Sequence, residues 1–490
     1  AVSLTIGIVG GILSSEVWWQ SIFPGSHAPG RRFRTHLVPW LGVRGALAVP
    51  RAIHEVIWGL FFINILGLDP LVAVLAIGVP FGAITAKIYA DILDETPKDG
   101  MRALQNSGVS PLKSFLYTLL PQAFPDLLSY GFYSLECAIR SAAVLGLIGA
   151  GGLGYQILLS LQSLQYDQVW TFLYALILLS GLTDWWSSLL HRRLQVTRHT
   201  RYDGRRTKDG GRRTTRGYTG DPFARFSIVA LVALAPFSFW YTHVDFGKLF
   251  APRTSRLFLG VIEDVFPPNF APDLLSHLFQ LSAQTLSMSI LAITVAGLGG
   301  LLLSFPAAAN FSLRGGIFDG GGRGGWQSIF GPVVLVVSRG VLLVARATSE
   351  GIWALLLLFV LFPGILPGAL ALGVYNLGVL GRLMAEVTEN VDSRPLRALK
   401  GQGATNAQVF IYGVLPQTLP KHLAYVLYRW EVCVRATVLV GLVGAGGLGR
   451  LLGDQLASFD YRSVLTSLIF YVGLMFSVDM LSALVRRAVR

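Results

Sequence analysis

Long apolar stretches separated by short polar ones recur along the whole chain of 490 residues. Most of them approach or exceed the roughly 20 residues that a helix needs to cross a bilayer. The seven stretches are Val56–Val79, Leu127–Gly149, Val169–Leu190, Leu281–Phe305, Ile352–Leu372, Leu423–Val443 and Val464–Val485. Only 14% of the residues are charged, compared with about 25% in ordinary soluble domains. The pattern therefore predicts an all-α polytopic membrane protein.

The two halves of the chain resemble each other at a constant offset of 295 residues. Identities at this offset extend from Arg51 and Arg346 to Tyr166 and Tyr461, which indicates an internal duplication. Upstream, pairing Gly10-Gly11 with Gly299-Gly300 gives an offset of 289, so we expect the second copy to be six residues longer there. We place the extra residues in the glycine-rich stretch 315–325.

The repeat predicts three parts: a first repeat over 1–190, a basic linker over 191–225 and a second repeat over 226–490. We expect the first repeat to be truncated at its N-terminus, because it lacks a counterpart of Leu281–Ser289. The linker holds eleven Lys and Arg against three Asp and supplies +8 of the net charge of +13. Such a stretch between apolar blocks is typical of a cytoplasmic loop. Nucleic-acid binding is disfavoured, since no aromatic residues interleave with the basic ones as in a stacking platform.

The loop charges give a membrane topology for the second repeat. We place crossings near 226–241, 281–305, 341–362, 367–386, 422–444 and 464–485, with the chain ending on the basic, cytoplasmic side. Equivalent points of the two repeats are then separated by six crossings, an even number. The repeats are therefore predicted to be parallel and related by a pseudo-twofold axis along the membrane normal.

One polar pattern, Arg-Ala-Leu-x-x-x-Gly followed by Leu-Pro-Gln, occurs once in each repeat. Its residues of interest are Arg102, Ala103, Gly108 and Pro121 in the first copy, and Arg397, Ala398, Gly403 and Pro416 in the second. A small residue lets a short helix pack closely, glycine permits the left-handed turn that ends it, and proline is tolerated in the first turn of the next helix. A single copy could be an ordinary connector between helices, but two copies at one offset favour a function.

This pattern resembles the EAA loop of ABC import permeases, in which a short helix docks into a groove on the ATPase subunit. The first position, usually Glu in such permeases, is Arg102 and Arg397 here, which puts a specific salt bridge in doubt. Residues 378–386, 412–420 and 427–449 resemble the phosphonate/phosphate import permease family. The resemblance covers nearly all of the second repeat and, more loosely, residues 41–190.

The resemblance implies two type I (MetI-like) permease repeats fused in one chain. It implies the membrane subunit of an importer that moves phosphonate, phosphate or phosphite by alternating access in the bacterial inner membrane. The implied partners are two ABC ATPase subunits, which bind ATP-Mg, and an extracytoplasmic phosphonate/phosphate-binding protein. Two alternatives stay open: an ABC import permease for another small solute, and an ion-coupled secondary transporter.

Arginine and glutamate residues are spaced four residues apart at equivalent places in apolar segments. The pairs are Arg51 with Glu55, Glu136 with Arg140, Arg346 with Glu350, and Glu431 with Arg435. On a helix each pair shares one face, and each charge costs at least about 2.5–3.5 kcal/mol at bilayer depth. One hypothesis is that the pairs are salt bridges that fix packing. The other is that Arg140 and Arg435 line the path of an oxyanion, which a guanidinium contacts well.

The stretches 149–154 and 444–449 match the G-x-G-x-x-G fingerprint of dinucleotide-binding proteins. Each follows an apolar helix rather than a strand, so we reject that function and predict a helix break with close backbone packing. The chain contains no Gly-x-x-x-x-Gly-Lys-Ser/Thr motif, and its eight His are scattered. We therefore predict no enzymatic activity, no cofactor and no metal site in this chain, with ATP hydrolysis on separate subunits.

Overall fold

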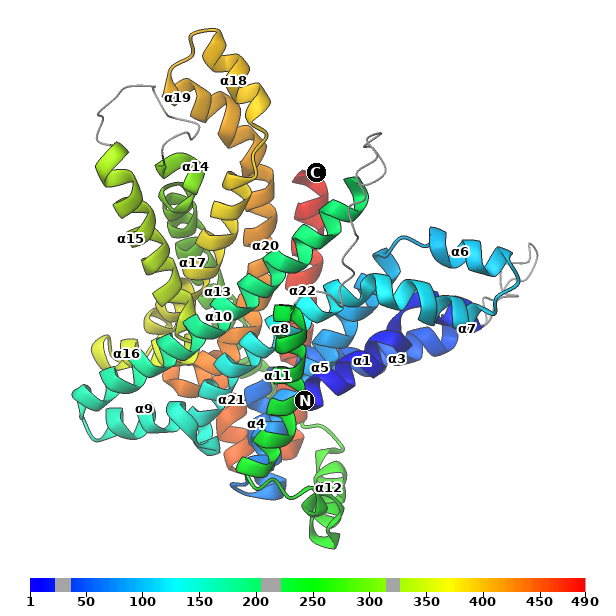
Figure 1. Ribbon diagram of the computed structural model, residues 1–490. Helices are drawn as coiled ribbons and strands as arrows, with labels where there is room; N and C mark the ends of the chain where they lie inside the picture. The colour runs from blue at the N-terminus through cyan, green and yellow to red at the C-terminus, as the bar shows by residue number, and fades with distance from the viewer. Residues whose placement is uncertain (23–36, 204–221, 314–326, 490) are drawn as a thin grey trace. The chain divides into compact units, whose positions relative to one another are not determined.

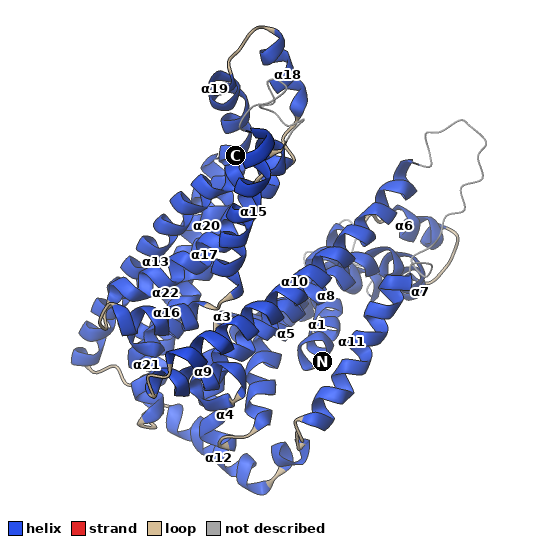
Figure 2. Ribbon diagram, turned by 60° about the vertical axis from the view of Figure 1, so that its left-hand side comes forward, coloured by secondary structure: helices blue, strands red, loops and turns tan. Residues whose placement is uncertain are grey.

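The computed structural model describes residues 1–22, 37–203, 222–313 and 327–489, which form helices joined by short turns, with no strand among them (Figures 1 and 2). The chain divides into two compact units, Ala1–Arg256 and Leu257–Arg490. Seven of the described helices are long and apolar enough to cross a membrane, or up to nine if each bent pair counts as one span. The prediction of an all-α polytopic membrane protein is confirmed.

Among its described residues, the first unit contains eleven α-helices and the beginning of a twelfth. They are α1 (Val2–Ser14), α2 (Glu16–Ile22), α3 (Leu37–Ala52), α4 (Glu55–Leu66), α5 (Pro70–Glu95), α6 (Asp99–Asn106), α7 (Pro111–Ser114), α8 (Leu120–Leu145), α9 (Gly152–Gln162), α10 (Tyr166–Asp203), α11 (Pro222–Tyr241) and the start of α12 (Pro252–Val265). The long helices α1 and α5 pack along each other, and α3, α4 and α8 pack against α5.

The second unit repeats this order. Its helices are α13 (Pro272–Ala307), α14 (Ala309–Ser312), α15 (Gln327–Ala347), α16 (Glu350–Val360), α17 (Ile365–Glu389), α18 (Ser393–Gly401), α19 (Asn406–Val409), α20 (Leu415–Val440), α21 (Gly447–Ala457) and α22 (Tyr461–Val489). Each helix from α1 to α10 thus has a counterpart from α13 to α22. The pair α13 and α17 packs as α1 and α5 do.

The predicted register upstream of Arg51 is wrong by four residues. Val2 lies against Gly78 as Val295 lies against Gly373, so α1 and α13 correspond at an offset of 293 and not 289. The same relation holds for Gly7 against Ala86 and Gly300 against Gly381. Four residues are about one helical turn, and small residues recur on this face at every turn, so the slipped alignment still paired glycine with glycine. The second copy is two residues longer, not six, and the stretch 315–325 lies outside the described residues.

Two of the apolar stretches do not form single spans. The stretch Val56–Val79 is divided by a turn at Gly67, whose φ of 73° ends α4, and Ile352–Leu372 is divided between α16 and α17. The predicted crossing near 341–362 likewise includes the end of α15 and the start of α16. Hydropathy averaged over a long window passes over such a break, although Gly67, Asp69 and Pro70 mark the first one in the sequence.

The helix that follows the basic linker packs in the first unit. Trp186 Nε1 of α10 donates to Ser227 Oγ of α11 (3.0 Å), and Leu231 packs with Phe132 and Leu190. The boundary between the two compact units along the chain therefore follows Arg256, whereas the boundary between the two sequence repeats was predicted at the linker. Helix α10 extends to Asp203, and 204–221 lie outside the described residues. The repeat bounds and the membrane topology stay predictions.

Candidate functional site

A short amphipathic helix follows the long helix α5 and another follows α17. We call α6 and α18 the coupling helices; in Figure 1, α18 lies beyond the ends of α17 and α20. Each buries one apolar residue on its inner side, Met101 in α6 and Leu396 in α18. The residues of interest on the outer side are all exposed: Arg102, Ala103, Arg397 and Ala398. Each coupling helix therefore leaves small and basic side chains exposed.

The glycine of each motif ends its coupling helix in the predicted left-handed turn. Gly108 has a φ of 82° and Gly403 a φ of 87°. Gly403 N–H donates to the Lys400 carbonyl (2.9 Å), and Ala404 N–H donates to that of Leu399 (3.1 Å). The same two bonds form after α6. This pair of bonds is a Schellman motif, which satisfies carbonyls at a helix end, so the predicted glycine turn is confirmed in both copies.

We predicted that the prolines of the motif restart a helix. Instead, they lie inside continuous helices. A π turn over Phe115–Leu119 joins α7 to α8, and a second over Phe410–Val414 joins α19 to α20. Pro121 and Pro416 directly follow these turns inside continuous helices. Proline has no N–H to donate, and a widened turn accommodates the missing bond. The Gln417 side chain then donates to a carbonyl of the turn, that of Gly413 (3.0 Å).

Three of the predicted charged residues of the first unit lie on α4 and α8. Arg140 Nη2 lies 3.4 Å from Glu136 Oε1, one helical turn away, and both side chains are mostly buried. Ser141 Oγ, next to this arginine, donates to Glu55 Oε1 of α4 (2.7 Å). Helix α4 thus brings a second carboxylate to the arginine-bearing segment of α8. The salt bridge of the packing hypothesis is present in this unit.

The pairs Arg51 with Glu55 and Arg346 with Glu350 do not share a helix face, because a break separates their members. Chain segments on either side of the first break meet at 87°. The residues before the two acids have extended backbone and act as N-caps: His54, whose side chain accepts from an N–H of α4, and Ser349. Each glutamate is therefore the first residue of a helix, where the helix dipole favours a negative charge.

The second unit holds a buried cation that the sequence comparison did not single out. Arg429 is 9% exposed, and its Nε donates to Asn376 Oδ1 of α17 (2.9 Å) while its guanidinium lies 5.7 Å from the Tyr375 ring. The predicted residue Arg435 has a buried Nε without a hydrogen-bond partner among the described residues. The first repeat has Ser134 in place of Arg429. A search for charges present in only one repeat would have found it.

The glycine-rich stretches break the helices as predicted. Gly149 and Gly444 have φ of 96° and 124°, and α20 and α21 meet at a bend of 67°. A Cβ added at Gly154 would lie 1.8 Å from the Ala143 carbonyl oxygen, and one at Gly449 would lie 2.3 Å from that of Val438. These glycines therefore serve close backbone packing.

Both halves of this architecture match a known family. The family described as binding-protein-dependent transport system inner membrane component matches residues 38–196 and again 324–490. The chain belongs to this family. The two matches confirm the internal duplication, and together with the apolar helices they make this permease a multi-pass protein of the bacterial inner membrane.

Related proteins carry names of anion importers. The phosphate-import permease protein PhnE of Mycolicibacterium smegmatis is 26% identical over 447 residues, 90% of this chain and 77% of that protein. The phosphite transport system permease protein PtxC of Stutzerimonas stutzeri is 34% identical over 203 residues, 41% of this chain and 68% of that protein. The putative phosphite permease HtxC of the same organism is 29% identical over 256 residues, 52% of this chain and 82% of that protein. The relatives are permease components and not enzymes.

Proposed function

We propose that this permease is the membrane subunit of an ABC importer for a phosphorus oxyanion: phosphonate, phosphate or phosphite. The observation that carries the proposal is the duplicated coupling helix, which presents the same exposed side chains before the same glycine turn in both units. The names of the relatives support the class of substrate. One ATPase subunit would dock on each coupling helix, and an extracytoplasmic binding protein would deliver the anion.

The buried arginines support an anionic cargo. A guanidinium presents a planar set of donors that fits a tetrahedral oxyanion, and it keeps its charge at any physiological pH. Arg140 and Arg435 occupy equivalent places in α8 and α20. We propose that they contact the anion as the two units alternate access, while the exposed coupling-helix residues receive the movement of the ATPase.

Uptake of labelled anions by the complete transporter tests the substrate class. Vesicles would contain the permease with its ATPase subunits and would receive the binding protein and ATP. We expect saturable uptake of at least one of phosphate, methylphosphonate and phosphite, with competition among those that bind and none from sulfate. Uptake of an unrelated solute, with no uptake of these three anions, would instead support the alternative of an ABC permease for another small solute.

A further inference from the structure

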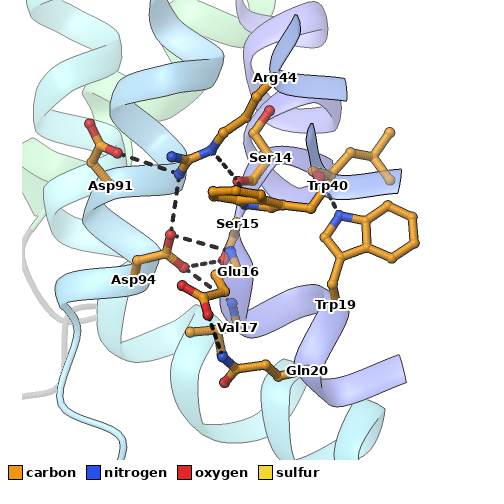
Figure 3. Close-up of polar contacts among 11 residues, drawn as sticks. Ser14, Ser15, Glu16, Val17, Trp19, Gln20, Trp40, Arg44, Asp91 and Asp94 are labelled. Atoms are coloured by element: carbon orange, nitrogen blue, oxygen red, sulfur yellow. Dashed lines mark hydrogen bonds and ion pairs between the residues drawn. The ribbon is translucent and has the colours of Figure 1, made fainter. Parts of the chain in front are cut away.

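A group of polar contacts joins several helix ends of the first unit, close to the end of α5 (Figure 3). The carboxylate of Asp94, on α5, accepts hydrogen bonds from Ser15 Oγ (2.7 Å) and from the backbone N–H groups of Glu16 and Val17 (both 3.2 Å). These three residues begin α2, and the N–H groups of a first helical turn have no partner within the helix. Asp94 therefore caps α2 from a neighbouring helix.

Arg44 of α3 completes this group (Figure 3). Its Nη2 lies 3.5 Å from Asp94 Oδ2 and 3.8 Å from Asp91 Oδ1. Its Nε donates to the carbonyl of Ser14, the last residue of α1 (3.1 Å), and its guanidinium lies 4.4 Å from the Trp40 ring. A cation is favourable at the carbonyl end of a helix. We call Arg44 and Asp94 the first clasp, because together they join α1, α2, α3 and α5.

Arg339 and Glu389 form a second clasp at the equivalent positions, each 295 residues further along the chain. Arg339 Nε donates to the carbonyl of Ala307, the last residue of α13 (3.0 Å), and Nη2 pairs with Glu389 Oε1 (2.5 Å). The same oxygen accepts the N–H of Ala309, the first residue of α14 (2.7 Å). The acid differs in length between the repeats, but the helix ends that it joins are the same. The clasp is thus a feature of the repeat.

The two capped helices also contact the residues around the coupling helices. Trp18 of α2 packs edge-on against Phe115, with ring centroids 5.3 Å apart, in the apolar cluster that holds the buried residue of α6. Phe311 of α14 packs edge-on against Phe410, 5.9 Å apart, and both lie in the cluster around the buried residue of α18. Short connections, 96–98 and 390–392, lead from α5 and α17 to the coupling helices. Each clasp is therefore linked to its coupling helix through the chain and through the apolar cluster to which the ring contact belongs.

We propose that the two clasps are positioning groups that transmit the movement of the coupling helices to the membrane helices. The inference rests on the proposed function, since it takes α6 and α18 as the places where the ATPase subunits dock. A displacement of α18 reaches α14 through the apolar cluster that contains Leu396, Phe311 and Phe410, and the second clasp holds α14 to α15 and to the ends of α13 and α17. Without the clasp, α14 keeps the bond from Asn310 Nδ2 to the Thr388 carbonyl of α17 (2.7 Å) but loses the Glu389 carboxylate and, through it, Arg339, and ATP is hydrolysed without an equal movement of the membrane helices.

Because the side chains of the second clasp are partly exposed, we expect its removal to affect coupling and not folding. The Arg339 and Glu389 side chains are 34% and 26% exposed. Ion pairs with this much solvent contact contribute little to stability, typically about 0–1 kcal/mol. Removal of one member should therefore leave a folded, inserted permease that still assembles with its ATPase subunits. A loss of transport per ATP is a readout that a purely structural ion pair would not produce.

The test measures anion uptake and ATP hydrolysis together, in vesicles that contain the complete transporter. For Glu389→Ala we expect uptake per ATP hydrolysed to fall about tenfold, within the usual range of coupling energies. Glu389→Asp, which introduces the acid that the first clasp uses, should keep most of the uptake. The charge swap Arg339→Glu/Glu389→Arg should not restore it, because a guanidinium cannot accept the Ala309 N–H and a carboxylate cannot donate to the Ala307 carbonyl.

A neighbouring ion pair provides the matched control. Arg382 and Glu386 both lie on α17, with Nε and Oε1 2.8 Å apart, and no bond to another helix is found for this pair in the part of the chain that the structure describes. Glu386→Ala should therefore leave uptake per ATP unchanged. Wild-type coupling in Glu389→Ala, or full restoration by the charge swap, would overturn the inference, and so would loss of the ATPase subunits from the purified variant. A wild-type complex with no ATP-driven uptake would contradict the proposed function itself.

Discussion

Replacing Gly403 by valine is expected to remove most ATP-driven uptake, although the coupling helix stays exposed and free of steric clashes. A Cβ at this glycine would meet no atom within 4 Å, so the effect comes from the backbone. Its φ of 87° is a conformation that costs an ordinary L-residue roughly 1–2 kcal/mol, and a β-branched residue more. Valine would shift the turn, break the two Schellman bonds and misplace α18 on its partner. Uptake and transport-stimulated ATP hydrolysis should both fall.

Two substitutions at the same helix end separate backbone strain from added bulk. Gly403→Asn should retain most activity, because asparagine tolerates the left-handed region. Gly401→Val should have little effect, because that glycine lies inside α18, has no positive φ, and has open space at its Cβ. The double variant Gly108→Val/Gly403→Val should show the largest loss. Wild-type coupling in this double variant would remove the coupling helices from the mechanism.

Neutralising Arg435 together with Glu431 is expected to give a folded permease that transports poorly. If the arginine served only to neutralise the glutamate, removing both would be far milder than removing one, since no buried charge would be left alone. If it contacts the oxyanion, the double variant Glu431→Gln/Arg435→Gln should still lose uptake, by about tenfold or more for a charged hydrogen bond worth ~1.5–3 kcal/mol.

The first unit offers a comparison in which the salt bridge is formed. Arg140 pairs with Glu136, and Ser141 holds Glu55 beside it. Glu136→Gln/Arg140→Gln should therefore lower uptake less than the equivalent change in α20. Arg435→Lys should retain partial uptake, since it keeps the charge but loses the planar pair of donors. The measurement is labelled-anion uptake at matched membrane abundance; near wild-type uptake by the α20 double variant would leave the salt bridge as the full account.

The repeat and the coupling helices could be predicted because the residues that define them are identical in the two halves of the chain at one constant offset. The pattern around Gly108 and Gly403 has a direct backbone meaning, and both glycines have the left-handed conformation that it required. The breaks before Glu55 and Glu350 could not be predicted from the apolar stretches, because those stretches begin at Val56 and Ile352, after the breaks. The spacing of four residues then suggested a shared helix face that does not exist.

The sequence comparison missed Asp94, Glu389 and Arg429 because these residues differ between the repeats. Asp94 and Glu389 perform one role with side chains of different length, so a search for identical residues passed over them. Arg429 has no charged counterpart, since Ser134 occupies its place. Its packing against Asn376 depends on how α17 and α20 are paired, which neither segment specifies alone. Comparison by charge rather than by identity would have found both clasps.

The central claim is that a separate ATPase drives transport through this permease. The most direct measurement is labelled phosphorus-oxyanion uptake in sealed vesicles, with ATP supplied and the ion gradients collapsed by ionophores. The account predicts uptake that persists without ion gradients and stops when the ATPase subunits are omitted or made unable to hydrolyse ATP. Uptake that continues without the ATPase and follows an imposed ion gradient would contradict it and identify an ion-coupled secondary transporter.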